Sequence, residues 1–253
     1  MNTSPVVGFN QRIKLEWMAA TARMVTSGSP YSEIVGGLRE LLKDELSVGG
    51  DPERGNREKA ITILKRIWLT VDEQNIQLRD DGLALLVRLP NHLHVAVHWS
   101  MAMAAYPFLG EVAQVVGRLL QLQDEVAATQ VQRRLRERFG ERETVARAAR
   151  RVLRTFIDWG VLQESGVKGI YHPVPRVSLK DDILLSWMAE AFIRCFDNQM
   201  RSVEEIRRAL AFFPFDTTPL DTTALPSNAR LEVFRQGVGE VLVRISKREA
   251  IDH

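Results

Sequence analysis

Residues 144–159 constrain the fold of this chain more than any other segment, because their side chains divide into two faces at helical spacing. At about 100° per residue, one arc of such a helix carries only arginines, and the opposite side is apolar. The arginines are Arg147, Arg150, Arg151 and Arg154, and the apolar residues are Val145, Ala148, Ala149, Val152 and Phe156. The pattern predicts a helix with one face in a core. Gly160 is expected to end it.

The arginine density continues upstream of this helix. Residues 130–154 contain nine arginines and three glutamates, a net charge of +6, whereas the whole chain carries +2. Val131, Leu135 and Phe139 predict an earlier helix that ends at Gly140. Charge runs are usually solvated helix faces, but acids are nearly absent from this arginine face. The charge therefore favours contact with a polyanion.

Two short strand signals follow, at residues 161–164 and 169–174, and they predict a hairpin with Lys168 in its turn. The order helix, turn, arginine-faced helix, hairpin resembles a winged helix-turn-helix. In that family the second helix enters the major groove of DNA and the hairpin contacts the backbone or the minor groove. The resemblance implies double-stranded DNA as the partner. The expected DNA-binding residues are Arg133, Arg134, Arg147, Arg150, Arg151, Arg154 and Lys168.

The rest of the chain predicts a mainly α fold with three parts. These are an N-terminal helical domain at 1–92, a winged helix-turn-helix domain at 93–176 and a C-terminal winged-helix-like module at 177–253. Apolar spacing predicts helices at residues 10–27, 32–46, 57–70, 93–106, 107–123 and 179–198. The run 83–89 is expected to open a further helix that stops at Pro90. The basic residues of the N-terminal part, Arg12 among them, are mixed with acids and are expected to face solvent.

The C-terminal module is expected to repeat the pattern of helix, helix and hairpin without the arginine density. Ser202 and Glu205 have the spacing of a capping box, which predicts a helix that runs to about Phe213. A long loop with prolines and threonines follows at 214–228. Gly237-Val238-Gly239 is the expected hairpin turn between strands at 231–236 and 240–245. This module could pack against a partner rather than bind DNA.

Little in the sequence indicates catalysis. No phosphate-binding loop, dinucleotide glycine fingerprint or Ser or Cys nucleophile motif is present, so we expect neither enzymatic activity nor a cofactor. His92, His94 and His98 could hold zinc, but no Asp or Glu in the segment could orient them. Histidines that cap or line a helix are the expected alternative. Cys195 is the single cysteine, which excludes an intramolecular disulfide, and its apolar neighbours predict a buried thiol.

Composition and hydropathy favour a cytoplasmic protein. Apolar residues make up 45% of the chain and charged residues 26%, which is typical of globular proteins. Residues 1–11 lack the apolar segment of a secretory signal. No run reaches 18 uncharged apolar residues, so no contact with a membrane is expected.

The overall layout resembles the BrxA-type proteins of bacterial BREX phage-defence systems. The resemblance rests on residues 147–162, RAARRVLRTFIDWGVL, and on the terminal hairpin at 230–245. It implies a helical DNA-binding protein with winged-helix-like modules, no evident catalytic site and other defence-system proteins as possible partners. Two classes of function stay open. One is a DNA-binding accessory protein, with a transcriptional regulator as a variant, and the other is a protein-interaction scaffold.

Overall fold

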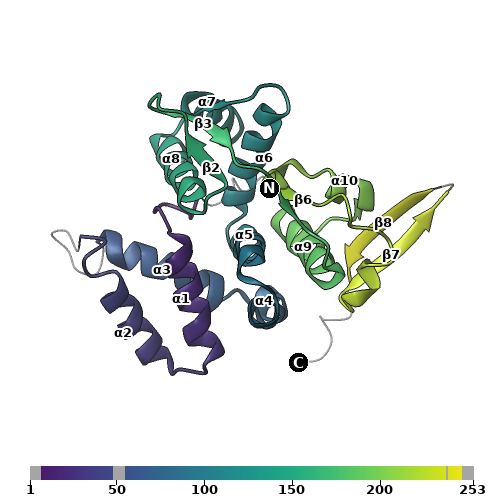
Figure 1. Ribbon diagram of the computed structural model, residues 1–253, viewed down its shortest axis with the longest axis horizontal. Helices are drawn as coiled ribbons and strands as arrows, with labels where there is room; N and C mark the ends of the chain where they lie inside the picture. The colour runs from purple at the N-terminus through teal and green to yellow at the C-terminus, as the bar shows by residue number, and fades with distance from the viewer. Residues whose placement is uncertain (1–6, 48–54, 238, 247–253) are drawn as a thin grey trace.

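The computed structural model describes residues 7–47, 55–237 and 239–246, and it is mainly helical with short strands in small sheets (Figure 1). The expected fold class is therefore confirmed. Residues 1–6, 48–54, 238 and 247–253 lie outside the described residues, and they include Val238 of the expected hairpin turn.

The N-terminal part consists of helices whose apolar stripes meet in a shared core. They are α1 (Leu15–Thr26), α2 (Tyr31–Leu41), α3 (Asn56–Trp68) and α4 (Ile76–Arg88), with a 3-10 turn at Glu73–Asn75. The expectation that residues 83–89 open a helix is wrong, because they form the C-terminal half of α4. In the first turns of α4 Leu78 is buried, whereas the other apolar residue there, Ile76, is exposed and the residues between Leu78 and Gly82 are polar. Leu78 alone is too weak a periodic signal to place the start of the helix.

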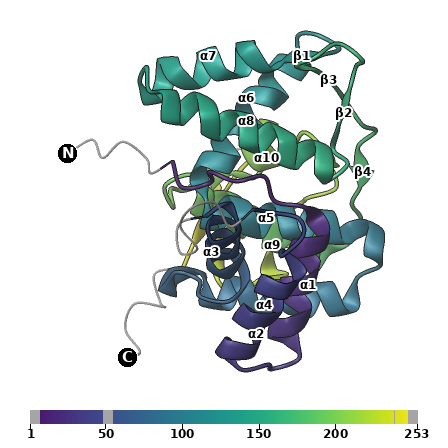
Figure 2. The same cartoon turned by 90° about the vertical axis from the view of Figure 1, so that its left-hand side faces the viewer.

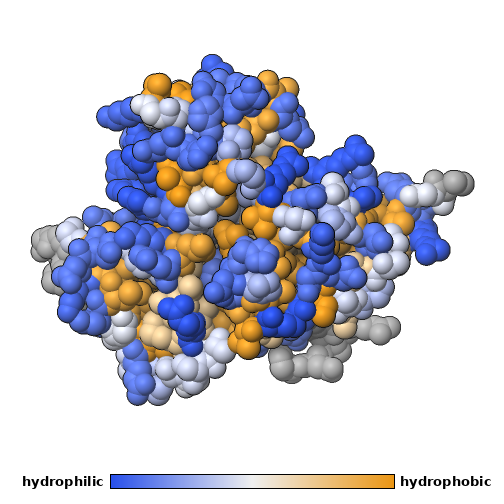
Figure 3. All heavy atoms as spheres, viewed as in Figure 1, coloured by the Kyte–Doolittle hydropathy of each residue, from blue (hydrophilic) through white to orange (hydrophobic). Residues whose placement is uncertain are grey.

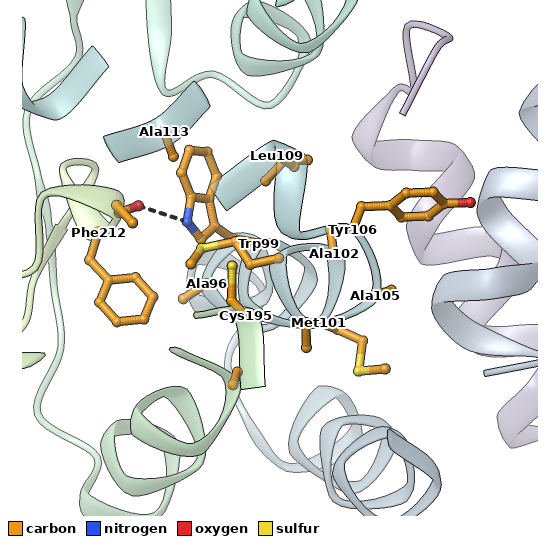
Figure 4. Close-up of a cluster of buried hydrophobic side chains, with 14 of the residues drawn as sticks. Ala96, Trp99, Met101, Ala102, Ala105, Tyr106, Leu109, Ala113, Cys195 and Phe212 are labelled. Carbon is orange, nitrogen blue, oxygen red and sulfur yellow. Dashed lines mark hydrogen bonds between the residues drawn. The ribbon is translucent and has the colours of Figure 1, made fainter. Parts of the chain in front are cut away.

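Helix α5 (His94–Ala105) lies at the centre of the molecule and follows a 3-10 turn at Asn91–Leu93. It packs against α1, α3, α4, α6 and α9, and nearly all of its side chains are buried. Trp99 of α5 stacks on Phe156 with ring centroids 4.5 Å apart. Its indole N–H donates to the Ala211 carbonyl at 3.1 Å, and this bond is the dashed line in Figure 4. Helix α5 therefore joins the parts of the chain into one continuous core.

The middle of the chain folds into three helices and a small three-stranded sheet. Its elements are α6 (Pro107–Leu120), β1 (Val126–Ala127), α7 (Ala128–Phe139), α8 (Glu143–Asp158), β2 (Leu162–Glu164) and β3 (Ile170–Pro173). The strands form an antiparallel sheet in the order β1-β3-β2, with Val126 opposite Tyr171 and Leu162 opposite Pro173. The expected hairpin is confirmed. Strand β1 was not expected, because two residues are too few for an alternating pattern.

The C-terminal part repeats the sheet but not the helix pair. Its elements are β4 (Val177–Ser178), α9 (Asp182–Cys195), β5 (Arg201–Ser202), α10 (Val203–Arg207), β6 (Phe215–Asp216), β7 (Leu231–Gln236) and β8 (Glu240–Ile245), with 3-10 turns at Leu210–Phe212 and Leu225–Ser227. The strand order β5-β8-β7 matches that of the first sheet, and β4 pairs with β6 in parallel. Between α10 and β7, where a second helix would stand, the chain forms 3-10 turns, β6 and loops.

The expectation that the helix after Ser202 runs to about Phe213 is wrong, because α10 ends at Arg207. The capping residue acts as expected, since Ser202 Oγ accepts from the Glu205 N–H at 3.0 Å. Ala209, however, has an extended backbone, with ψ at 120°. The carbonyl of Ala211 then accepts the Trp99 indole N–H instead of a helical partner. Tertiary packing on α5 and α6 thus overrides the local helical signal.

Candidate nucleic-acid interface

Helix α8 has the two faces that its sequence predicts. Val145, Ala148, Ala149, Val152 and Phe156 are all buried. On the opposite side Arg147, Arg150 and Arg154 are exposed and Arg151 is half-buried. The outer side of α8 lies at the front in Figure 2, below α7. In Figure 3 hydrophilic residues cover much of the visible surface over α7 and α8.

The expectation that acids are nearly absent from this face is wrong at both ends of the helix. Arg150 lies 2.9 Å from Glu143 in the first turn, and Arg154 forms an ion pair with Glu164 of β2. Both pairs are exposed, and such pairs contribute about 0–1 kcal/mol, so a phosphate can replace the carboxylate. Arg147 and Arg151 have no ion pair among the residues that the structure describes.

The segment before α1 attaches to the C-terminal end of α8. The Ile13 N–H donates to Thr155 Oγ1 at 3.0 Å, and the Trp159 indole N–H donates to the Ile13 carbonyl at 2.9 Å. Arg12 donates to both carboxylate oxygens of Asp158. The expectation that Arg12 only faces solvent is therefore wrong. At 100° per residue Asp158 falls within the arginine arc, so Arg12 neutralises a carboxylate on that face.

The hairpin that forms the wing lies beside the arginine face. Strands β2 and β3 are joined by a turn in which Gly166 and Gly169 have φ of 86° and 83°, a backbone region that favours glycine. Lys168 in this turn is exposed. Glu164, the last residue of β2, contacts Arg154. The contact brings the arginine face next to the residues that lead into the wing turn.

Helix α7 supplies the two remaining expected DNA-binding residues. Arg133 and Arg134 are both exposed, while Val131, Leu135 and Phe139 hold the helix in the core. Arg133 lies 3.8 Å from Glu137, and Arg134 has no ion pair within the described residues. The structure thus places all seven expected residues at or near the surface of one module, with Arg151 the least exposed.

The three histidines do not converge on one point. His92 is exposed in the 3-10 turn, and His94 Nε2 lies 2.9 Å from the Leu89 carbonyl at the end of α4. His98 is buried against the edge of Trp68, with ring centroids 5.4 Å apart. Within residues 7–47, 55–237 and 239–246 no group of three or more His, Cys, Asp or Glu side chains could hold a metal ion.

Cys195 is buried, as expected, and burial raises the pKa of its thiol well above the ordinary value. The thiol is therefore protonated at neutral pH, and a protonated thiol is a poor nucleophile.

No family model matches the chain, and no curated protein or solved structure matches it either. In the described part of the chain, no helix has the length and apolar character needed to cross a membrane.

Proposed function

We propose that the protein is a non-enzymatic accessory protein that binds double-stranded DNA through α8 and the β2–β3 wing. The observation that supports this most is the exposed arginine row of α8, which occupies the position of the groove-binding helix in a winged helix. Arginine suits the task because its planar guanidinium donates two parallel hydrogen bonds to a phosphate or to guanine.

The two ends of α8 have different roles in this proposal. The C-terminal end is held by Ile13 and Arg12, so it faces the N-terminal helices. Among the described residues, no hydrogen bond or ion pair joins the segment before α1 to the N-terminal half of α8, and in helix-turn-helix proteins the N-terminal residues of this helix contact base edges. Arg147, Arg150 and Arg151 would therefore enter the groove, and Arg154 and Lys168 would contact phosphates. Three arginines can read only a few base edges, and the phosphate contacts carry no sequence information, so we expect a weak sequence preference.

The C-terminal module is not included in the proposed DNA surface. It lacks the second helix of the pair, and Arg207 donates from Nε and Nη2 to the Thr218 carbonyl at 3.0 and 2.8 Å. Arg207 and Arg208 both form ion pairs with Glu204. Arg207 thus holds the loop that replaces the missing helix, and Arg208 is paired with Glu204 of α10.

The double variant Arg147→Gln with Arg150→Gln tests the proposed surface. It removes one arginine without an ion pair among the described residues and one that pairs with Glu143. The matched control is Arg235→Gln with Arg208→Gln, since Arg235 is exposed without such a pair and Arg208 pairs with Glu204. In DNA titrations the α8 variant should lose about tenfold or more in affinity, because each lost base contact costs roughly 1–3 kcal/mol.

Both double variants should melt within a few degrees of the wild-type protein, because exposed substitutions change stability by about 0.5 kcal/mol. Equal losses of DNA affinity in both variants would show that only diffuse positive charge attracts DNA. Unchanged affinity in the α8 variant, with loss of a protein partner, would support the scaffold function instead.

The resemblance to BrxA-type proteins leads us to propose a role in bacterial phage defence, in the cytoplasm and together with other defence proteins. Deletion of the gene should raise the plating efficiency of phages on the host. The wild-type gene should restore resistance and the α8 double variant should not. Full restoration of phage resistance by that variant would show that any defence role does not depend on DNA binding by α8.

A further inference from the structure

A half-open cavity of about 740 Å³ lies in the N-terminal part, lined by residues of α1, the end of α4 and the start of α5. Small-molecule sites in proteins have volumes of roughly 300–1,000 Å³. Its apolar walls include Leu15, Ala19 and Leu86, and its polar lining includes Arg23, His94 and His98. The cavity is separate from the arginine row of α8.

His98 is the least expected residue in this lining. Its side chain is 1% exposed, and neither ring nitrogen has a hydrogen-bond partner among the described residues. Buried polar groups are nearly always hydrogen-bonded, and an unbonded one destabilises the fold. Burial, and then the charges of His94 and Arg23, lower the pKa of His98 to about 3, so its ring is neutral at pH 7. A neutral imidazole offers one donor and one acceptor.

The charges around the cavity favour an anion. Arg23 is exposed on the α1 wall and has no ion pair within the described residues. The one acidic residue of the lining, Glu16, has an exposed carboxylate that water screens, and it lies 3.5 Å from Lys14 Nζ, which Glu16 shares with Glu45. A guanidinium without a carboxylate partner at the edge of an apolar cavity is suited to a carboxylate, sulfonate or phosphate group.

We propose that this cavity binds a small organic acid with an apolar body. The acidic group contacts Arg23, the body lies against Leu15, Ala19 and Leu86, and a polar atom of the ligand hydrogen-bonds to His98. The site is independent of the proposed DNA surface, because none of its residues is part of that surface.

A pair of fluorescent probes tests the proposal. The probes are 1-anilinonaphthalene-8-sulfonate and N-phenyl-1-naphthylamine, which has the same body without the sulfonate. The sulfonate probe should bind the wild-type protein saturably at one site. Arg23→Gln should weaken it about tenfold, the effect of one charge-assisted hydrogen bond, and should leave the neutral probe unchanged. Arg235→Gln, another exposed arginine without an ion pair among the described residues, should change neither. Equal effects of the two variants would overturn the assignment of the anion to Arg23.

The location is tested by filling the cavity and by observing His98. Ala19→Phe places a ring in the cavity and should abolish binding of both probes without a loss of cooperative melting. In the wild-type protein, the ¹⁵N resonances of the His98 ring should shift when the sulfonate probe saturates. Binding that survives Ala19→Phe, or saturation without a His98 shift, would overturn the proposed site. Absence of saturable binding would show a cavity that holds only water.

Discussion

At the scale of single residues, the buried His98 ring couples folding to pH. Its pKa in the folded protein is lowered to about 3 from the ordinary value of 6.5. As the pH falls below about 6.5 the unfolded chain binds a proton at this residue and the folded protein does not. The free energy of unfolding is therefore unaffected by protonation of this residue above about pH 6.5. It falls progressively as the pH is lowered from there to the folded-state pKa of about 3.

Chemical denaturation of the wild-type protein and of His98→Gln at about pH 7 and about pH 5 measures this coupling. The free energy of unfolding of the wild-type protein should fall by about 2 kcal/mol more than that of the variant, since the slope is about 1.4 kcal/mol per pH unit below 6.5. The other titrating groups are the same in both proteins, so their contributions cancel when the two losses of free energy are subtracted. Equal losses would show that His98 is protonated in the fold.

At the scale of elements, Gly117 sets the distance between α6 and the 3-10 turn at Leu210–Phe212. A Cβ atom at this position would lie 2.1 Å from the Leu210 carbonyl oxygen, which is backbone and cannot move alone. The close approach brings the C-terminal part against α6, where the 3-10 turn replaces the expected helix. Gly36, in contrast, lies in α2 with nothing within 4 Å of its Cβ position.

The two glycines should respond to alanine in opposite directions. Gly117→Ala should destabilise the protein by about 1–3 kcal/mol, the usual effect of overpacking. Gly36→Ala should stabilise it by about 0.5–1 kcal/mol, because glycine is unfavourable inside a helix. Thermal melts of both variants measure the effects. A Gly117→Ala protein as stable as the wild type would contradict the close contact.

Elements were predictable from the sequence where one segment carries its own periodic pattern. The two faces of α8 and its end before Gly160, with φ at 67°, follow from local spacing and from glycine chemistry. The expected start of α4 and the expected end of α10 were wrong because tertiary contacts decide them. In the first turn of α4 Leu78 is buried in the core while Ile76 is exposed, and after α10 the Ala211 carbonyl accepts from Trp99.

At the scale of the whole molecule, a buried ion network joins the C-terminal part to the N-terminal helices. Glu190 of α9 is fully buried and accepts from Arg230 Nε at 3.0 Å and from Asn228 at 2.7 Å. Arg230 also contacts Asp81 of α4. Burial alone would raise the pKa of Glu190, but the hydrogen bond from Arg230 and the nearby arginine charges lower it.

Arg230→Met should therefore destabilise the whole protein by about 3–5 kcal/mol, because it removes a main partner of a buried carboxylate. Arg39→Met is the control, since Arg39 pairs with Glu58 at 2.9 Å on the surface and should cost about 0–1 kcal/mol. Denaturant titrations compare the two. Similar small losses would mean that Arg194, which lies 2.6 Å from Glu190, compensates the carboxylate without Arg230.

Features that depend on distant parts of the chain were not predictable from the sequence. The contact between Arg12 and Asp158 joins residues 146 positions apart. The cavity beside His98 is built from α1, α4 and α5. Neither leaves a local spacing pattern, whereas the seven expected DNA-binding residues all come from one continuous arginine-rich segment and its hairpin.

The proposal that α8 binds DNA is tested most directly by the salt dependence of affinity for a short duplex. Binding should be measured by fluorescence anisotropy across a series of salt concentrations. If the phosphate contacts come from Arg154 and Lys168 together with the exposed Arg133 and Arg134 of α7, the logarithm of the association constant should fall linearly with the logarithm of salt concentration, with a slope of about −4. Arg154→Gln should reduce the slope by about one. No binding at low salt, or an affinity that does not change with salt, would contradict the proposal.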